Sequence, residues 1–554
     1  MADASFDVVI VGGGCKGLAL ACYLAKYGGM SVGIFERRHE LGLGVYSLES
    51  PAPGFTANHC SHWHSARSYY GIFQEDFPEA VDYGLQYKPM LLTFGQYFIE
   101  DDSWIGTYHP HFDPTGERTA ELWARFSEKD AEKWLYLHDK IKKYWEPAMW
   151  EYMHTPAPPP GIPSALTRLA LFSNPEETGF NPQWVMMAPY QVYQDMFESP
   201  ECQLAWARFV WSATAAPDAW AMGMIAAGVL IICLQGADVL PGGSHTVAHV
   251  EQKIILENGG KIFANSEVKK ILVENGRAKG IRLADGTEIE AKQAVAINVT
   301  PFALIELLGR EHFSSKILRR IEQLERDFTC ISWYTWALHE HPHYKGEAFH
   351  PDIKGMDWIS VGTKSMEDML RACRRQRMKM WPEAERPGGL TLCISDHSRA
   401  VPELAPPGKA TVLTECYVPP ANSHTPEEWK EFEKRHAEDI IREWGKIAPN
   451  MTWDNVIGYN PITPYHLAQL DPFHFGREGN WFQIDMTAPQ VDVYRPCAEL
   501  SSNKVPGIDN LYLTGVCYYP PAGGGSFQPG YVTYKIMAID IGLRMPWEEK
   551  GRPY

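Results

Sequence analysis

Three glycines near the N-terminus, Gly12, Gly14 and Gly17, have the spacing G-x-G-x-x-G. The first glycine permits a tight turn, the second lets backbone approach a diphosphate, and the third lets a helix pack closely on a strand. Glu36 follows about 20 residues further on, where a carboxylate accepts hydrogen bonds from a ribose diol. The pattern predicts a dinucleotide held at a helix N-terminus, and the carboxylate disfavours a 2′-phosphate on that ribose.

The elements that would position these residues read as strand, helix and strand. Residues 6–11 form a short apolar run, which is typical of a parallel strand buried on both faces. Residues 18–26 have apolar side chains at helical spacing, and residues 31–35 form a second apolar run that ends at Glu36. We therefore expect a Rossmann βαβ unit, with the glycines at its first turn.

Two later blocks also have an α/β pattern. Residues 236–310 contain a helical stretch followed by strands that are separated by Asn275-Gly276 and Asp285-Gly286. Such pairs are strong hairpin signals, so a small β-meander is expected there. At the C-terminus, residues 510–516 form a strand that is followed by a Pro/Gly-rich turn and a final helix over 529–543.

The bulk composition excludes several classes of protein. The 554 residues exceed the size of a single core, so two or more domains are expected. With 51 basic and 68 acidic residues the net charge is −17, and a nucleic-acid partner is not expected. The 11 cysteines include no C-x-x-C pair, which favours a reducing, cytoplasmic location and argues against structural zinc.

One apolar stretch bears on the location of the protein. Residues 219–234 are 16 residues without a charge, short of the ~20 needed to span a bilayer. We expect a buried helix there. The alternative is a segment that touches lipid, so a cytoplasmic protein with peripheral membrane contact stays open.

The sequence around these motifs resembles a known family. Residues 7–38 (DVVIVGGGCKGLALACYLAKYGGMSVGIFERR) resemble the opening of the FAD-dependent amine oxidase and carotenoid desaturase superfamily, most closely its phytoene dehydrogenase-like branch. Residues 240–296 and 494–538 resemble later stretches of the same family, in the same order. The resemblance implies an α/β protein with a discontinuous Rossmann-type FAD-binding domain (1–85, 236–310 and 495–554) and an inserted α+β substrate domain (86–235 and 311–494).

The resemblance also implies which residues contact FAD. The glycines of the first turn would meet the diphosphate, Glu36 the adenosine ribose, and Val268 the adenine ring. The full implied set is Gly12, Gly14, Gly17, Glu36, Arg37, Gly44, Val268, Gly515, Gly524 and Gly525. The chain departs from the family pattern at residues 41–45 and 516–519, near the flavin ring, which leaves the exact reaction open.

Three histidines follow in segment 58–64, which in the family approaches the flavin from the substrate side. His59 and His62 are candidates to orient or deprotonate a substrate, because histidine titrates near neutral pH. Structural histidines in a turn are the alternative. The pair His62 and His64 lacks a third candidate ligand, so no metal site is expected.

Two tyrosines complete the candidate catalytic set. Tyr518 and Tyr519 stand between the last strand and the glycine-rich turn, so they would border the flavin as aromatic walls. Ordinary core packing is an equally good interpretation of these two residues.

The sequence thus predicts an FAD-dependent dehydrogenase or desaturase that moves a hydride from an apolar or alicyclic carbon substrate to flavin N5. A second G-x-G-x-x-G after a strand is lacking, so electrons would pass to oxygen, a quinone or another external acceptor. A flavin amine oxidase and a flavin-dependent isomerase are enzymatic alternatives. A lipid escort resembling Rab GDP-dissociation inhibitors is the non-enzymatic one.

Overall fold

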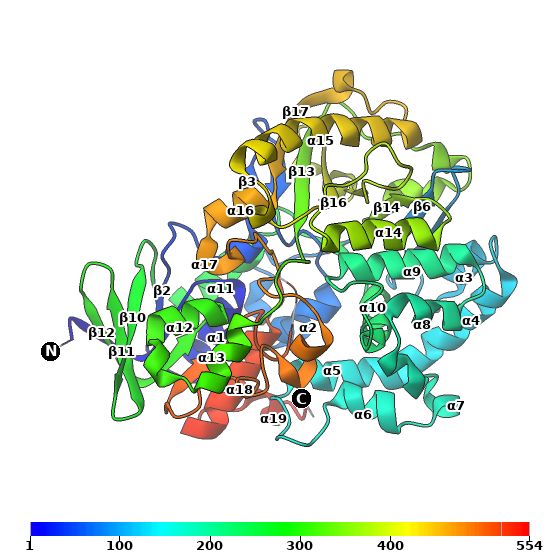
Figure 1. Cartoon of the computed structure of the whole chain (residues 1–554). Helices are drawn as coiled ribbons and strands as arrows, with labels where there is room; N and C mark the ends of the chain where they lie inside the picture. Colours follow the sequence, from blue (N-terminus) through cyan, green and yellow to red (C-terminus); the bar gives the residue numbers. More distant parts are fainter. Residues whose placement is uncertain (1, 522, 524, 553–554) are drawn as a thin grey trace.

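The computed structural model describes residues 2–521, 523 and 525–552. Its two large sheets have seven strands each. Figure 1 shows one sheet beside helices at the N-terminal end of the molecule, and the other beneath α15 (Pro426–Ile447) at the top. The α/β fold class that the sequence indicated is confirmed.

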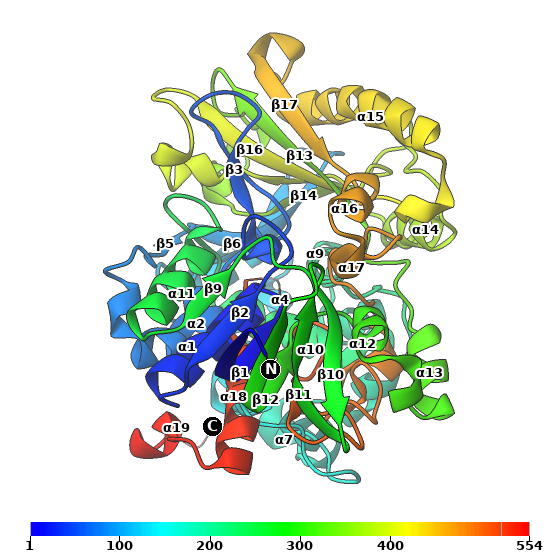
Figure 2. The same cartoon turned by 90° about the vertical axis from the view of Figure 1, so that its left-hand side faces the viewer.

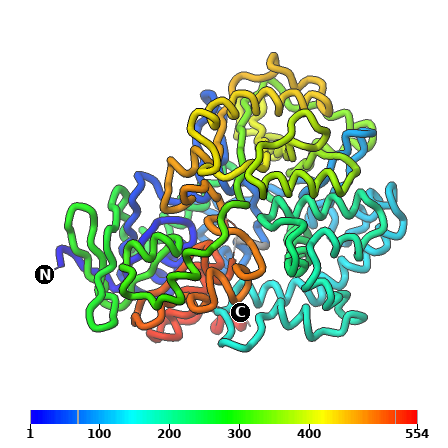
Figure 3. Tube along the Cα trace, viewed as in Figure 1, coloured from blue at the N-terminus to red at the C-terminus, as the bar shows by residue number. Residues whose placement is uncertain are grey.

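The first sheet gathers strands from three distant parts of the chain. Parallel pairing joins β1 to β2 and β12, β2 to β9, and β12 to β18, while β10, β11 and β12 pair antiparallel. The strands are β1 (Ala4–Val11), β2 (Val32–Phe35), β9 (Lys261–Phe263), β10 (Val268–Glu274), β11 (Arg277–Leu283), β12 (Glu288–Ile297) and β18 (Leu511–Leu513). Figure 3 shows the blue, green and red parts of the trace meeting there.

Helices cover both faces of this sheet. Alternate residues of β1 explain the two layers, because Val8 and Ile10 pack into one core and Val9 and Val11 into another. On the first face lie α1 (Cys15–Lys26), α11 (Thr246–Glu257) and α18 (Gln528–Ile541), and on the second lie α12 (Pro301–Leu308) and α13 (Ser315–Glu322) (Figure 2). Residues 15–25 are all buried, since α1 packs between α11 and α18.

The second sheet carries the larger core. It runs in the order β17 (Val456–Ile462), β13 (Ile331–Leu338), β16 (Ala410–Tyr417), β15 (Cys393–Ser395), β14 (Ile359–Gly362), β6 (Leu92–Phe98) and β7 (Trp104–Tyr108). The helices α4 (Glu128–Lys140), α8 (Pro189–Met196) and α9 (Pro200–Ser212) share its hydrophobic core. Fully buried tryptophans, including Trp134 and Trp206, fill this core.

Several local predictions are confirmed. The glycine-punctuated stretch after residue 267 forms the meander β10–β11–β12, and α15 begins with the capping box of Thr425 and Glu428. The long apolar stretch forms the buried helix α10 (Gly223–Leu234). Among the described residues, no helix combines the length and apolarity that crossing a bilayer requires. The domain boundaries stay a prediction.

Candidate functional site

A crevice opens at the carboxyl ends of the parallel strands, where ligands bind in open α/β sheets. It encloses about 120 Å³. Its walls come from the turn after β1, the end of β2, the start of β10 and the segment after β12. The residues that line it include Gly12, Gly14, Lys16, Glu36, Arg37, Gly44, Val268, Asn298, Asp471, Gln483 and Val516.

The turn after β1 has no room for side chains. Gly12 has a φ of +93°, and a Cβ there would lie 2.6 Å from the carbonyl oxygen of Asn298. A Cβ on Gly17 would lie 2.6 Å from the Gly12 carbonyl oxygen. At Gly14 the nearest atom would be the Asn298 side-chain nitrogen, at 2.9 Å. The predicted glycines therefore form a tight backbone cradle at the start of α1, and such a cradle fits a diphosphate.

Glu36 is fixed in place by backbone. Its Oε2 accepts a hydrogen bond from the N–H of Gly13 at 2.8 Å, and its Oε1 accepts one from the N–H of Arg38 at 2.9 Å. Burial raises the pKa of Glu36, and these two N–H groups oppose that rise. Each carboxylate oxygen keeps a further lone pair, so a ribose diol can still donate to it.

Two residues that the sequence patterns did not single out complete the cradle. Asn298, just after β12, donates its side-chain N–H to the carbonyls of Gly12 (3.3 Å) and Gly14 (3.1 Å). Lys16, in the first turn of α1, donates to the carbonyl of Gly523 at 2.5 Å, and burial lowers its pKa to about 8. The position of Asn298 at the end of a parallel strand was the signal available in the sequence.

The other implied FAD residues are distributed unevenly. Val268 and Gly44 line the crevice. Arg37 lines it too, with its guanidinium 2.6 Å from Asp471 and 4.8 Å from the ring centre of Phe473. These three contacts suit the adenosine end of a dinucleotide.

The glycines near the C-terminus lie around the crevice rather than in its described lining. Gly515 has a φ of +120°, and a Cβ there would lie 3.0 Å from the Asn298 side-chain oxygen. Gly525 packs against His64, where a Cβ would lie 3.0 Å from the ring. Gly524 lies outside the described residues. The cofactor roles of these glycines stay predictions.

A second cavity of about 230 Å³ adjoins the first. Cys60, Trp481 and Phe482 line both, so the two spaces meet at these residues. Most of the second wall is apolar, and α10 supplies one side of it. The apolar lining consists of Met149, Tyr152, Met153, Leu166, Phe209, Met224, Ile225, Val229, Ile232, Trp333, Trp358 and Met486. We refer to it as the apolar cavity.

Of the candidate catalytic residues, His62 lines the apolar cavity. Its Nδ1 has no hydrogen-bond partner among the described residues, and burial places its pKa well below the ordinary 6.5. The ring packs against Trp358 and against His397, which is itself hydrogen-bonded to Asp357 at 2.7 Å. His62 is therefore a neutral imidazole that faces apolar space.

The structure does not bring the other candidates into either described lining. Both ring nitrogens of His59 lack partners among the described residues, and burial lowers its pKa to about 4. Tyr518 is fully buried in the core beneath β1 and β12. Tyr519 donates to the carbonyl of Tyr152 at 3.2 Å. Both tyrosine rings turn into packed cores after the β18 strand, which is the alternative left open by the sequence.

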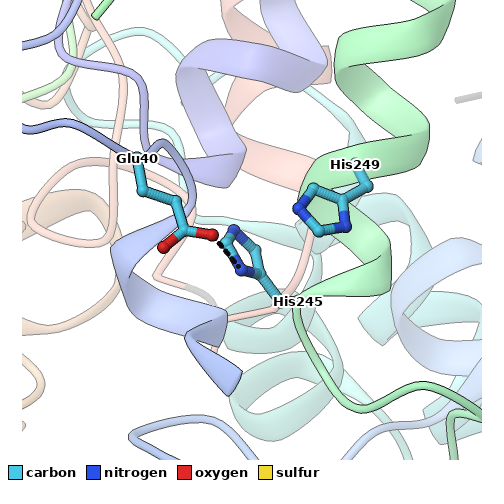
Figure 4. A group of neighbouring side chains, drawn as sticks. All are labelled: Glu40, His245 and His249. Carbon is cyan, nitrogen blue, oxygen red and sulfur yellow. Dashed lines mark ion pairs between the residues drawn. The ribbon is translucent and has the colours of Figure 1, made fainter. Parts of the chain in front are cut away.

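A carboxylate and two histidines lie beside the loop that follows β2. Figure 4 shows Glu40 pointing to His245, with His249 one turn further along α11. His245 Nδ1 is 3.0 Å from Glu40 Oε1, and its Nε2 is 2.7 Å from the carbonyl oxygen of Leu41. Such a group can hold a metal ion. Since both nitrogens of His245 are engaged, we interpret it as an anchor of the loop on α11.

Known proteins resemble this chain over most of its length. Residues 10–79 match the model of the NAD(P)-binding Rossmann-like domain. One of the polypeptides of limonene dehydrogenase from Castellaniella defragrans is 25% identical over 98% of this chain and 96% of its own length. The neurosporene-forming phytoene desaturase of Rhodobacter capsulatus is 26% identical over 51% of this chain and 50% of its own.

Solved structures show the same architecture. A putrescine oxidase variant superposes with a TM-score of 0.59 at 12% identity, covering 97% of this chain and 99% of that one. The sequence relatives bear the names of oxidoreductases, which supports an oxidoreductase here. The chain therefore has the fold of the FAD-dependent amine oxidase and carotenoid desaturase superfamily, and its sequence relatives lie in the phytoene dehydrogenase-like branch.

Proposed function

We propose that this protein is an FAD-dependent dehydrogenase or desaturase that acts on an apolar or alicyclic carbon substrate. The observation that carries the proposal is the meeting of the crevice and the apolar cavity at Cys60, Trp481 and Phe482. A dinucleotide with its adenosine near Glu36 would extend its other end towards that junction. Limonene dehydrogenase and phytoene desaturases, by their names, act on apolar hydrocarbons, which supports the same substrate class.

The residues of the crevice fit FAD. The glycine turn and Lys16 would hold the diphosphate, Glu36 the ribose, and Val268 the adenine. Bound FAD would supply a hydride acceptor at its N5 atom. The protein contributes position, exclusion of water and proton transfer.

His62 would be the base of the reaction. Removing two hydrogens from neighbouring carbons requires that one leave as a hydride and the other as a proton. The neutral imidazole faces the cavity and can take the proton at Nδ1. The apolar walls orient the substrate by shape, because they offer few hydrogen bonds. Electrons would then pass to an external acceptor such as oxygen or a quinone.

The test begins with colour. The purified protein should show the visible absorption of a flavin, whereas a lipid escort would be colourless. Under anaerobic conditions, cyclic alkenes, cyclic ketones, carotenoids and amines are then added one class at a time. Bleaching by an apolar alicyclic compound supports the proposal, and bleaching by amines alone would replace it with an amine oxidase.

A further inference from the structure

The wall of the apolar cavity contains a buried carboxyl group that the proposed chemistry does not use. Glu415 lies on β16, where it pairs in register with Trp333 of β13 and Cys393 of β15. Its exposed fraction is 3%, and it lines the cavity together with Trp333. Burying a carboxyl group in apolar surroundings is costly, so its presence there calls for a function.

The hydrogen bonds of Glu415 leave part of the group unused. Oε2 accepts from the indole N–H of Trp333 at 2.9 Å, and Oε1 accepts from the hydroxyl of Tyr417 at 3.3 Å. A carboxylate has about four acceptor positions, and an indole can only donate. The group can therefore offer the cavity either a free lone pair or, when protonated, an O–H donor.

The charged and titratable neighbours leave Glu415 as the group that titrates near neutrality. Arg208 of α9 lowers its pKa, and burial raises it, to a net value of about 7. The other facing groups are Tyr417, Cys393 and Cys416, and burial raises the pKa of each of them. The arginine stays protonated throughout.

A second carboxyl group on the same cavity has a different role. Asp492 Oδ2 accepts from the hydroxyls of Ser164 (2.9 Å) and Thr167 (2.7 Å), which fixes the start of α6 (Ala165–Phe172). Its Oδ1 has no hydrogen-bond partner among the described residues. Asp492 is thus a structural anchor and a competing position for a polar ligand group.

We propose that the cavity selects an alicyclic substrate bearing one oxygen function, a hydroxyl or a carbonyl, which hydrogen-bonds to Glu415. This proposal rests on the proposed function and narrows its substrate class. A hydroxyl oxygen can accept from the protonated acid or donate to the carboxylate. A ketone oxygen can only accept, so it needs the protonated acid.

The test uses three matched probes, p-menthane, menthol and menthone, which share one carbon skeleton. Binding to the purified protein is followed by tryptophan fluorescence, because Trp333, Trp358 and Trp481 lie in the wall. Menthol should bind about tenfold more tightly than p-menthane, the value of one hydrogen bond in a buried site. Menthone should lose about tenfold in affinity from about pH 6 to about pH 8, as Glu415 deprotonates. Menthol should not show that loss.

Two variants assign the effect to a residue. Glu415→Gln keeps a donor and an acceptor at the same volume, so menthone binding should become independent of pH. Asp492→Asn should keep the pH dependence of the wild type. The proposal is overturned, with the proposed function intact, if the three probes bind equally or if the pH dependence survives Glu415→Gln and disappears in Asp492→Asn. If none of the probes binds, the apolar substrate class itself falls.

Discussion

The crevice and the apolar cavity lie side by side but are built in opposite ways. The crevice is made of backbone, with three glycines of one turn and a carboxylate held by two N–H groups. The cavity is made of side chains from α9, α10, β13, β16 and the segment 481–492. The first construction fixes one charged ligand tightly, and the second accepts a range of apolar shapes. Substitutions should therefore separate cofactor binding from substrate binding.

The largest effect should come from Gly12→Ala. A methyl group there meets the Asn298 carbonyl at 2.6 Å, and the φ of +93° is strained for alanine. The variant should be purified without flavin, as measured by visible absorbance per protein. Gly29→Ala is the matched control, since Gly29 has a φ of +61° and no atom within 4 Å of its added Cβ. Equal flavin content in the two variants would contradict the assigned role of the turn.

His62→Gln tests the cavity side of the comparison. Loss of the base should lower the rate of flavin reduction by about 10²-fold or more, with flavin content unchanged. The measurement is anaerobic stopped-flow reduction by the substrate. Reduction at the wild-type rate would remove His62 from the mechanism.

The pH dependence of the same rate follows from the buried state of His62. Its neutral form is the active base, and its pKa lies well below the ordinary 6.5. As pH falls, protonation should therefore slow flavin reduction only well below 6.5, when measured with a substrate that has no oxygen function. A midpoint at or above 6.5 would mean that another group titrates.

Glu36→Gln should have an intermediate effect on the crevice alone. The amide keeps the shape but loses the charge that accepts two backbone N–H groups, and FAD affinity should fall by roughly 10- to 100-fold. Equilibrium titration of the apoprotein with FAD measures the change. The Kd of the apolar probe p-menthane should stay at its wild-type value, and a change there would show that the two regions are coupled.

The smallest effect should come from filling the cavity at Gly228 of α10. A Cβ there would contact only the Met149 methyl group, at 3.4 Å, and the residue lines the cavity. Gly228→Leu should weaken substrate binding by about tenfold, and it should raise helix stability by up to about 1 kcal/mol. Gly228→Ala is the control that keeps most of the volume. The KM for the substrate and the midpoint of thermal unfolding report the two changes.

The contrast between the regions also explains what the sequence could predict. The turn at Gly12, Gly14 and Gly17, the strand before it and Glu36 form one local pattern, so their placement followed from spacing. The hairpin pairs and the capping box of α15 are local in the same sense. The α/β class was predicted on this basis and is confirmed.

Features that depend on distant segments were not predictable in the same way. No local pattern indicates that Glu415 and Trp481 face one cavity, because residues from five elements meet there only after folding. Strand β12 closes the meander and also pairs with β1, which the hairpin signals alone did not indicate. Tyr518 and Tyr519 have suitable sequence positions, but their rings pack into cores.

Arg495 ties the two regions together. This fully buried cation donates from Nε to the carbonyl of Val516, at 2.8 Å, and from Nη1 to the sulfur of Met486, at 3.5 Å. Val516 lines the crevice and Met486 lines the apolar cavity. One guanidinium therefore acts as a rigid spacer between the ligand spaces. The gap that a hydride must cross would be set by this planar group, and a shorter lysine could not hold both walls at once.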